Sequence, residues 1–207
     1  MALDALLEKP LPICETATAE ELDILVTEIY DINDPDTDRL ARCISRCEPD
    51  QVSFAKLRHL RILGDHDKYY LERFEQNGIS RGCYLNADAT WLLLILPEQS
   101  DPNNYLSRCR DALESLSIRC TPVYTLDVST MAGLKRLELE DNPMLKNVAG
   151  VSNLTVLEQL TITDCPRLRK LPGLEKLKNL SNVHQGGYAN NRCSQGHSIH
   201  PVKNQKG

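Results

Sequence analysis

The sequence predicts an α/β fold built by stacking a short repeat, and three observations predict it. The frame L-x-x-L-x-[LI] recurs in phase, with full copies starting at Leu113, Leu134 and Leu157 and a partial copy starting at Leu180. These starts lie 21, 23 and 23 residues apart, which is the spacing of leucine-rich repeats. The ninth position, where the chain must turn, holds Thr121, Asn142 and Cys165. Asn and Cys are the preferred residues there. We therefore predict a short leucine-rich-repeat solenoid with parallel strands on its concave face and helices or loops on its convex face.

Apolar anchors also mark the returning half of each repeat. They are Leu145, Val148, Val151 and Leu154 in one repeat and Leu168, Leu171, Leu174 and Leu177 in the next. One repeat cannot bury both its strand and its returning half, so neighbouring repeats must stack to form a core. We predict four or five repeats over residues 52–183.

Residues 1–51 are expected to form an acidic, α-helical N-terminal cap. Thr18 and Glu21 have the spacing of a capping box, and Leu22, Leu25, Val26 and Ile29 follow at helical spacing. A second helix is predicted from about Asp36 to the residues before Pro49. Because terminal repeats need a cover, we expect these helices to close the open end of the solenoid.

Residues 52–112 contain two earlier copies of the frame. The first starts at Leu57, and a degraded copy starts at Ala89, in phase with Leu113. The longer interval between them predicts an insertion over about 66–88, with a helix near 69–74 on the convex side. Residues 103–111 are expected to return as a helix too. The alternative left open is that residues 66–112 form an independent α/β element.

The pattern ends after Val183, and residues 184–207 are polar and poor in apolar side chains, so we predict a disordered tail. Two clusters resemble metal sites but depart from the known spacings, so no metal and no cofactor are expected. One is the calcium-loop-like run Asp34, Asp36 and Asp38; the other is the trio Cys193, His197 and His200.

Charge and cysteine usage restrict the class of protein further. The net charge of −5 combines −9 over residues 1–50 with +7 over residues 166–207, a polarity that can steer partners or let the ends attract each other. The eight cysteines form no C-x-x-C pair, and residues 1–12 do not resemble a secretory leader. We therefore expect reduced thiols and a cytoplasmic, or alternatively nuclear, location. The apolar run 91–97 is too short to span a membrane.

Two stretches carry a family resemblance. Residues 54–63, FAKLRHLRIL, resemble the entry into the leucine-rich domain of plant disease-resistance proteins, the nucleotide-binding leucine-rich-repeat immune receptors. Residues 157–172, LEQLTITDCPRLRKLP, are similar to the repeat of that family. The resemblance implies an intracellular role in defense, with repeats that sense pathogen effectors or regulate the receptor. No G-x-x-x-x-G-K-[ST] phosphate loop occurs, so the family's nucleotide switch is not expected here.

The repeats supply a binding surface rather than a catalytic pocket. Alternate side chains of each strand leave the core and should form ladders across the repeats. The predicted partner-binding residues are Ser115, Arg136, Gln159 and Asn182 in one row, Ser117, Glu138, Thr161 and His184 in a second, and Arg119, Glu140 and Thr163 in a third. Because no nucleophile, acid–base or zincin motif is present, we expect no enzymatic activity.

We expect a protein partner, for example a pathogen effector or another receptor domain, and neither a membrane nor a nucleic acid. Extended concave surfaces of repeat proteins typically bind proteins or peptides. The alternatives are a leucine-rich-repeat adaptor outside immunity, such as a substrate adaptor of a ligase, or a truncated receptor fragment.

Overall fold

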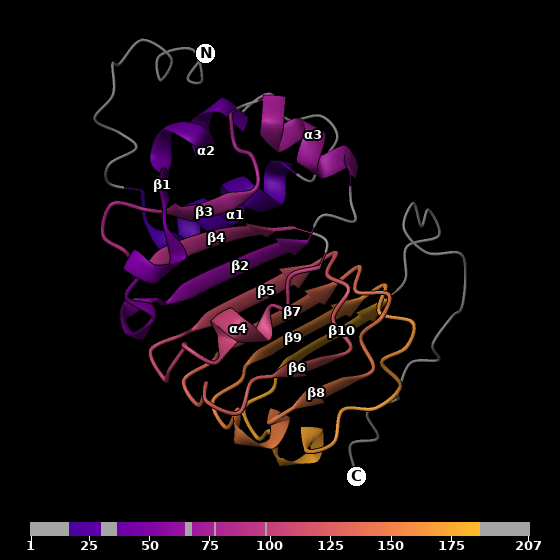
Figure 1. Cartoon of the computed structure of the whole chain (residues 1–207). Helices are drawn as coiled ribbons and strands as arrows, with labels where there is room; N and C mark the ends of the chain where they lie inside the picture. The colour runs from indigo at the N-terminus through magenta and orange to yellow at the C-terminus, as the bar shows by residue number, and fades with distance from the viewer. Residues whose placement is uncertain (1–16, 30–36, 65–67, 77, 98, 187–207) are drawn as a thin grey trace, which may run out of the picture.

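The computed structural model describes residues 17–29, 37–64, 68–76, 78–97 and 99–186 (Figure 1). It is a mixed α/β structure whose main element is an eight-stranded sheet of order β1-β3-β4-β2-β5-β7-β9-β10. In the order of the sheet, β4, β2, β5, β7, β9 and β10 pair in parallel. At the β4 edge, β3 pairs antiparallel with β4, and β1 pairs antiparallel with β3. The bounds are β1 Ser45–Cys47, β2 His59–Gly64, β3 Gly82–Leu85, β4 Trp91–Leu96, β5 Ser115–Arg119, β7 Arg136–Glu140, β9 Gln159–Thr163 and β10 Asn182–Gly186.

The strand pairing follows the register that the repeated frame predicts. Leu116 pairs with Leu137, Leu137 with Leu160, and Leu160 with Val183, so the fourth frame position forms one row. The side chains of this row and of the sixth position point to one face of the sheet, called here the leucine face. The alternate positions point to the opposite face, called here the ladder face.

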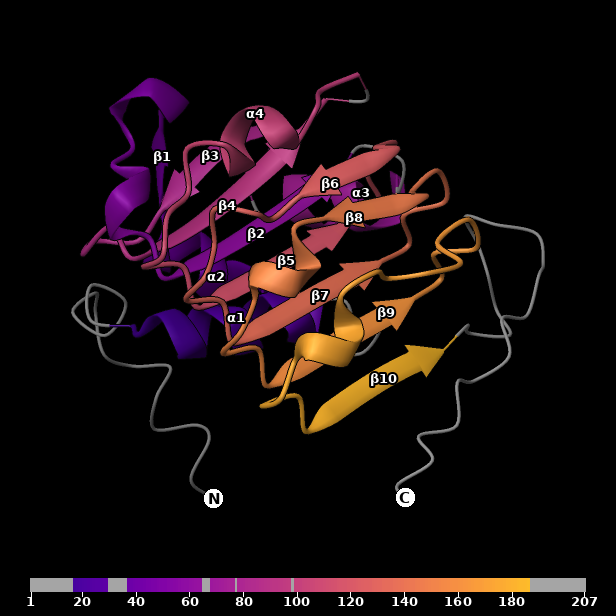
Figure 2. The same ribbon diagram turned by 90° about the horizontal axis from the view of Figure 1, so that it is seen from below.

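The leucine face is covered by the returning halves of the repeats. These contain the short parallel strands β6 (Thr125–Asp127) and β8 (Asn147–Ala149), helix α4 (Asn103–Leu106) and the 3₁₀ turns η5 (Val151–Asn153) and η6 (Leu174–Lys176). Figure 2 shows β6 and β8 lying over the large sheet. The anchors Leu145, Val148, Val151 and Leu154 are all buried in the core that joins the two layers. Two further 3₁₀ turns, η3 (Pro49–Gln51) and η4 (Phe54–Lys56), precede β2.

Ninth-position side chains hold the turns together inside this core. The Asn142 amide donates to the carbonyl oxygens of Ile118 and Glu140, and its oxygen accepts from the backbone N–H and hydroxyl of Thr121. The Cys165 thiol donates to the carbonyl oxygen of Thr163 at 3.4 Å. The ninth-position side chains of Asn142 and Cys165 thus bond backbone at the turn, whereas the Thr121 hydroxyl bonds the Asn142 side chain.

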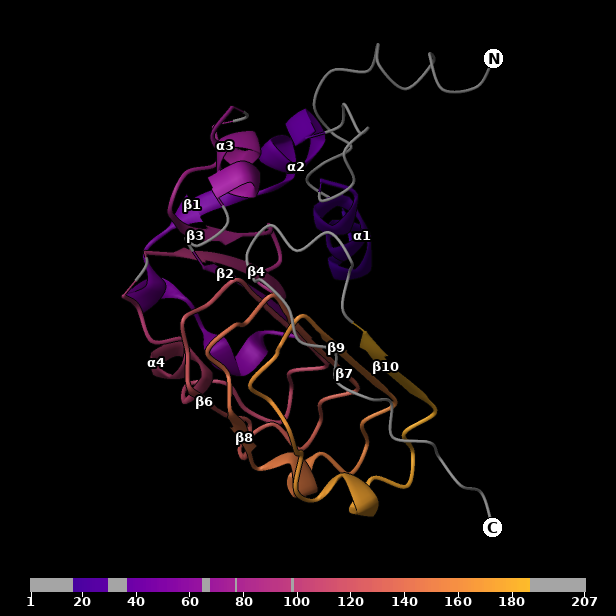
Figure 3. The ribbon, with the colours of Figure 1, turned by 90° about the vertical axis from the view of Figure 1, so that its right-hand side faces the viewer.

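The helices α1 (Ala19–Ile29), α2 (Thr37–Cys43) and α3 (Lys68–Gln76) cover part of the ladder face. Figure 3 shows α1 on the side of the sheet opposite to β6 and β8. A second apolar core lies beneath these helices, and it contains Leu22 and Val26 of α1, Phe74 of α3 and the outward side chains of β4. The capping box is present, since the Glu21 N–H donates to Thr18 Oγ1 and the Thr18 N–H donates to Glu21 Oε2.

The placement of these helices corrects two expectations. They lie on the ladder face rather than at the end of the repeat stack, and α3 lies on that face rather than on the convex side. The physical reason is that the outward positions of β4 hold Trp91, Leu93 and Ile95, which require cover on this face as well.

Strand order corrects a third expectation. The copy of the frame at Ala89 keeps the predicted register, because Leu60 pairs with Leu92. Its strand β4 nevertheless lies beyond β2, and β2 pairs directly with β5. The segment between β2 and β5 therefore adds its strands, β3 and β4, on the side of β2 that faces away from β5. The segment 66–112 is not an independent α/β element either, because β3 and β4 belong to the same sheet as the repeats and share their apolar core.

Three element boundaries also differ from the expectations. The second helix ends at Cys43, and Ser45–Cys47 is a strand paired with β3. The predicted helix over 103–111 is only the single turn α4. His184 and Gly186 belong to β10, so the predicted tail does not begin at 184; residues 187–207 lie outside the described residues.

Candidate functional site

The part of the ladder face that α1–α3 leave uncovered extends over β5, β7, β9 and β10. The three predicted rows exist, because Ser115, Arg136, Gln159 and Asn182 are consecutive partners, as are Ser117, Glu138, Thr161 and His184, and Arg119, Glu140 and Thr163. Gln159, Asn182 and His184 are exposed, and Ser117, Arg136, Glu138, Glu140 and Thr161 are half-buried. These eight residues are called here the open ladder.

Three predicted contact residues do not present their side chains to a partner. Ser115, Arg119 and Thr163 are all buried. Ser115 lies under α1, with its hydroxyl 3.5 Å from Asp23 Oδ2. Arg119 is engaged by two carboxylates, since its guanidinium lies 2.7 Å from Glu140 Oε2 and 3.2 Å from Asp141 Oδ2. The alternation along the strands predicts that these positions leave the core, but it does not show that α1 and neighbouring carboxylates bury Ser115 and Arg119.

Acidic side chains gather where the strands of the open ladder end. Burial raises the pKa of the Glu140 carboxyl, and the charges of Glu138 and Asp164 add to the increase while Arg119 opposes it. Asp141 and Asp164 have left-handed backbone conformations, with φ of 51° and 52°. The repeated turn thus brings a carboxylate to the same place in successive repeats.

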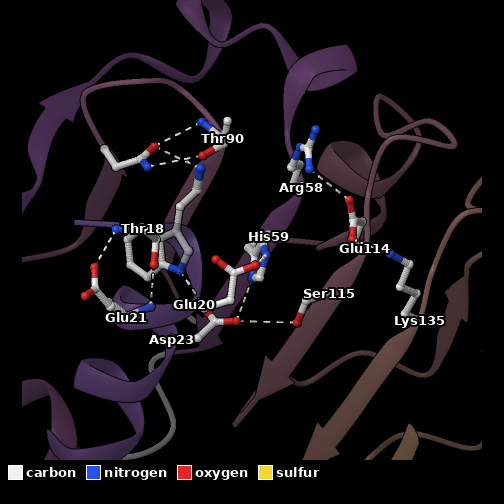
Figure 4. A network of polar contacts seen from close by, with 12 residues as sticks. Thr18, Glu20, Glu21, Asp23, Arg58, His59, Thr90, Glu114, Ser115 and Lys135 are labelled. Carbon is white, nitrogen blue, oxygen red and sulfur yellow. Dashed lines mark hydrogen bonds and ion pairs between the residues drawn. The ribbon is translucent and has the colours of Figure 1, made fainter. Parts of the chain in front are cut away.

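A polar cluster fastens α1 to the sheet at the border of the open ladder (Figure 4). Asp23 of α1 accepts from His59 Nδ1, Arg61 Nε and Trp91 Nε1, each at 2.8 Å. Burial alone raises the pKa of the Asp23 carboxyl, but the bond from His59, the charge of Arg61 and the further bonds outweigh it. The net pKa lies well below the ordinary 3.8. Asp23 is therefore ionised, and Nδ1 of His59 must donate to it because a carboxylate only accepts.

The geometry of this cluster differs from that of a hydrolytic triad. In a triad the His bridges the Ser and the Asp, with the Ser hydroxyl on one ring nitrogen and the Asp on the other. Here the hydroxyl of Ser115 and Nδ1 of His59 both approach the same oxygen of Asp23. The other ring nitrogen, Nε2, lies 3.4 Å from Glu20 Oε1. The arrangement anchors a helix rather than activating a hydroxyl.

Asp23 was not among the predicted site residues, although the sequence around it carries a signal. Asp23 falls among Leu22, Leu25 and Val26, the apolar residues by which α1 packs. An acid beside a buried helix face needs a buried partner, and the outward positions of β2 supply His59 and Arg61.

A depression of about 550 Å³ lies beside the start of α1 and is lined by Thr18, Glu20, Arg58, Asp88 and Thr90, among others. Most of these groups already have partners. Arg58 pairs with Glu114 at 3.3 Å, and the Thr90 hydroxyl donates to Asp88 at 2.6 Å. The depression therefore offers few unused groups to a ligand.

Among the described residues, no group of three or more His, Cys, Asp or Glu side chains could hold a metal ion. Asp34 and Asp36 of the calcium-like run, and all three of Cys193, His197 and His200, lie outside the described residues.

No protein-family model, no curated protein and no solved structure matches this chain. Among the helices that the structure describes, none is long and apolar enough to cross a membrane.

Proposed function

We propose that this chain is a short leucine-rich-repeat solenoid that binds a protein partner through the open ladder and catalyses no reaction. The observation that carries the proposal is the agreement between sequence frame and strand register over β5, β7, β9 and β10. It brings polar side chains 21–23 positions apart into continuous rows, and a surface of stacked rows suits recognition of an extended protein surface.

The chemistry of the open ladder favours a protein partner of mixed polarity. Arg136 and Glu138 present opposite charges on one strand, and Gln159, Asn182 and His184 add hydrogen-bonding groups at the exposed end. Half-buried charges of this kind contribute specificity and association rate more than affinity. The resemblance of residues 54–63 and 157–172 to plant immune receptors suggests that the partner is a pathogen effector or another receptor domain, in a cytoplasmic or nuclear setting.

Affinity capture from plant cytosol tests this proposal. The full chain and the variant Arg136→Glu/Glu138→Lys are used as bait, and retained proteins are identified by mass spectrometry. Both side chains are half-buried at the surface, so the variant should keep the fold, which circular dichroism checks. Lys56→Glu, an exposed charge change before β2 and away from the open ladder, serves as the matched control.

The proposal predicts a partner that the wild type and the Lys56→Glu variant retain and that the ladder variant loses. Retention of the same proteins by all three baits would refute the open ladder as the binding surface. Capture of a defense-related protein would favour the receptor interpretation, whereas capture of ligase subunits would favour the adaptor.

A further inference from the structure

The end of the repeat stack at β10 has features that the open ladder does not use. β10 pairs with β9 along one side, and no described strand pairs with its other side (Figure 2). An unpaired edge presents a row of backbone N–H and C=O groups to which another extended chain can add.

The apolar core is open at the same edge. Val183 and Leu160 occupy the same row, yet 47% of Val183 is exposed against 2% of Leu160. The first frame position shows the same difference in exposure, since Leu157 is buried whereas Leu180, next to the edge, is half-buried. Leu171 and Leu174 of the returning half are also half-buried. A segment lying along β10 would cover these side chains if it brought apolar residues to the leucine face.

The returning half beside this edge is strongly basic. Five cations between β9 and β10 are exposed, and among the described residues none of them forms an ion pair: Arg167, Arg169, Lys170, Lys176 and Lys178. The acid in this stretch, Glu175, accepts from the backbone N–H of Gly173 at 3.1 Å. The edge therefore combines unused backbone groups, uncovered apolar side chains and an excess of positive charge.

The positive charge, the free backbone groups and the apolar side chains of this edge restrict which kind of molecule can bind there. A second copy of the chain, joined edge to edge, would bring the same five cations together. The following residues 187–207 contain Arg192, Lys203 and Lys206 and no acid, so they do not complement the charge either. A nucleic acid would leave the backbone row and the apolar side chains unused, and residues 165–186 contain no Phe, Tyr or Trp for base stacking.

We propose that an acidic peptide segment of another protein adds as a strand to β10, with apolar side chains over Val183 and Leu180 and carboxylates beside the cations. This site shares strand β10 with the open ladder but uses its free backbone edge and its leucine-face side chains, so different variants test the two proposals.

A fluorescence-anisotropy titration of the full chain tests the proposal. The probe is a fluorescein-labelled peptide in which Val and Thr alternate between terminal Glu pairs. A matched peptide carries Lys in place of Glu, and another carries N-methyl groups on one edge to block strand addition. Protein variants are Arg169→Glu/Lys178→Glu at the edge and Arg42→Glu/Lys56→Glu elsewhere, all at exposed positions.

Saturable binding of the acidic peptide is expected, with a loss of roughly tenfold or more in affinity for the edge variant and for high salt, because exposed ion pairs are reversed or screened. The N-methylated and Lys peptides should bind much more weakly, and the Arg42→Glu/Lys56→Glu and open-ladder variants should bind like the wild type.

Equal binding of the N-methylated peptide, or an equal loss with the Arg42→Glu/Lys56→Glu control, would overturn the proposal. Displacement of the peptide by a uridine oligomer at lower concentration would overturn it in favour of nucleic acid. Self-association in sedimentation experiments that the edge variant abolishes would overturn it in favour of a second copy.

Discussion

The anchoring of α1 by Asp23 makes the most informative prediction about this fold. Asp23→Ala removes an ionised acceptor from three donors that lie 2.8 Å away, on His59, Arg61 and Trp91. The side chains of His59 and Arg61 are only 2% and 10% exposed, so water cannot fully replace the carboxylate. Removing one member of a mostly buried, charge-assisted cluster should lower the free energy of unfolding by about 3 kcal/mol.

Urea denaturation followed by circular dichroism measures this loss. Glu20→Ala is the matched control, because Glu20 approaches the same His59 from the same helix but is 63% exposed. The control should cost less than about 0.5 kcal/mol, as exposed ion pairs contribute little. A loss below about 1 kcal/mol for Asp23→Ala would refute the view that the cluster fastens α1 to the sheet.

The same variant gives a pH test. The folded pKa of Asp23 lies below its ordinary 3.8, so its contribution to stability is present above that value and is lost as the pH falls below it. The stability difference between wild type and Asp23→Ala should therefore shrink on going from about pH 5 to about pH 2. A difference that stays constant over this range would contradict the assignment of an ionised Asp23.

Three further predictions test the repeat core. Leu160→Asp, at a buried position, should unfold the chain in circular dichroism melts, whereas the neighbouring Thr161→Asp should keep the fold; equal destabilisation would contradict the register. Asn142→Ala should lower stability in urea by about 2–3 kcal/mol, because it leaves buried backbone groups without partners; a change near zero would contradict that role. Burial raises the pKa of the Cys165 thiol to about 12, so it should resist iodoacetamide at pH 8 in the native protein and react in urea, as mass spectrometry can measure. Rapid native alkylation would contradict this.

The repeated frame predicted the strands and their register from β5 to β10 because each core position recurs at a nearly fixed interval. It could not predict the place of β4, since a frame defines which residues face the core but not on which side of β2 the strand adds. The apolar outward residues Trp91 and Leu93 do indicate that helices must cover β4 on the ladder face, because a strand that is apolar on both faces must be covered on both.

The positions of most candidate site residues were also predictable, but which of them are buried or paired was not. The rows of the open ladder follow from alternation along the strands. The burial of Ser115 under α1 depends on a contact between segments far apart in the sequence, about which periodicity carries no information. Arg119 and Glu140 are neighbours in the predicted third row, but alternation along the strands does not show that Arg119 is buried there.

The position of β2 between β4 and β5 has a consequence for folding. His59 pairs with Ser115, 56 positions later, whereas Leu137 pairs with Leu160, only 23 positions later. Closing the longer loop costs more entropy, so the repeats from β5 onward can associate through short loops before β2 finds β5. In the native state the order of local opening is reversed, because among the described strands β10 pairs with β9 alone, while β2 is buried between two strands and beneath α1. Amide protection against hydrogen exchange should therefore fall from β2 towards β10. The native chain should open first at β10, although the repeats at that end are joined by the shorter loops and associate first during folding.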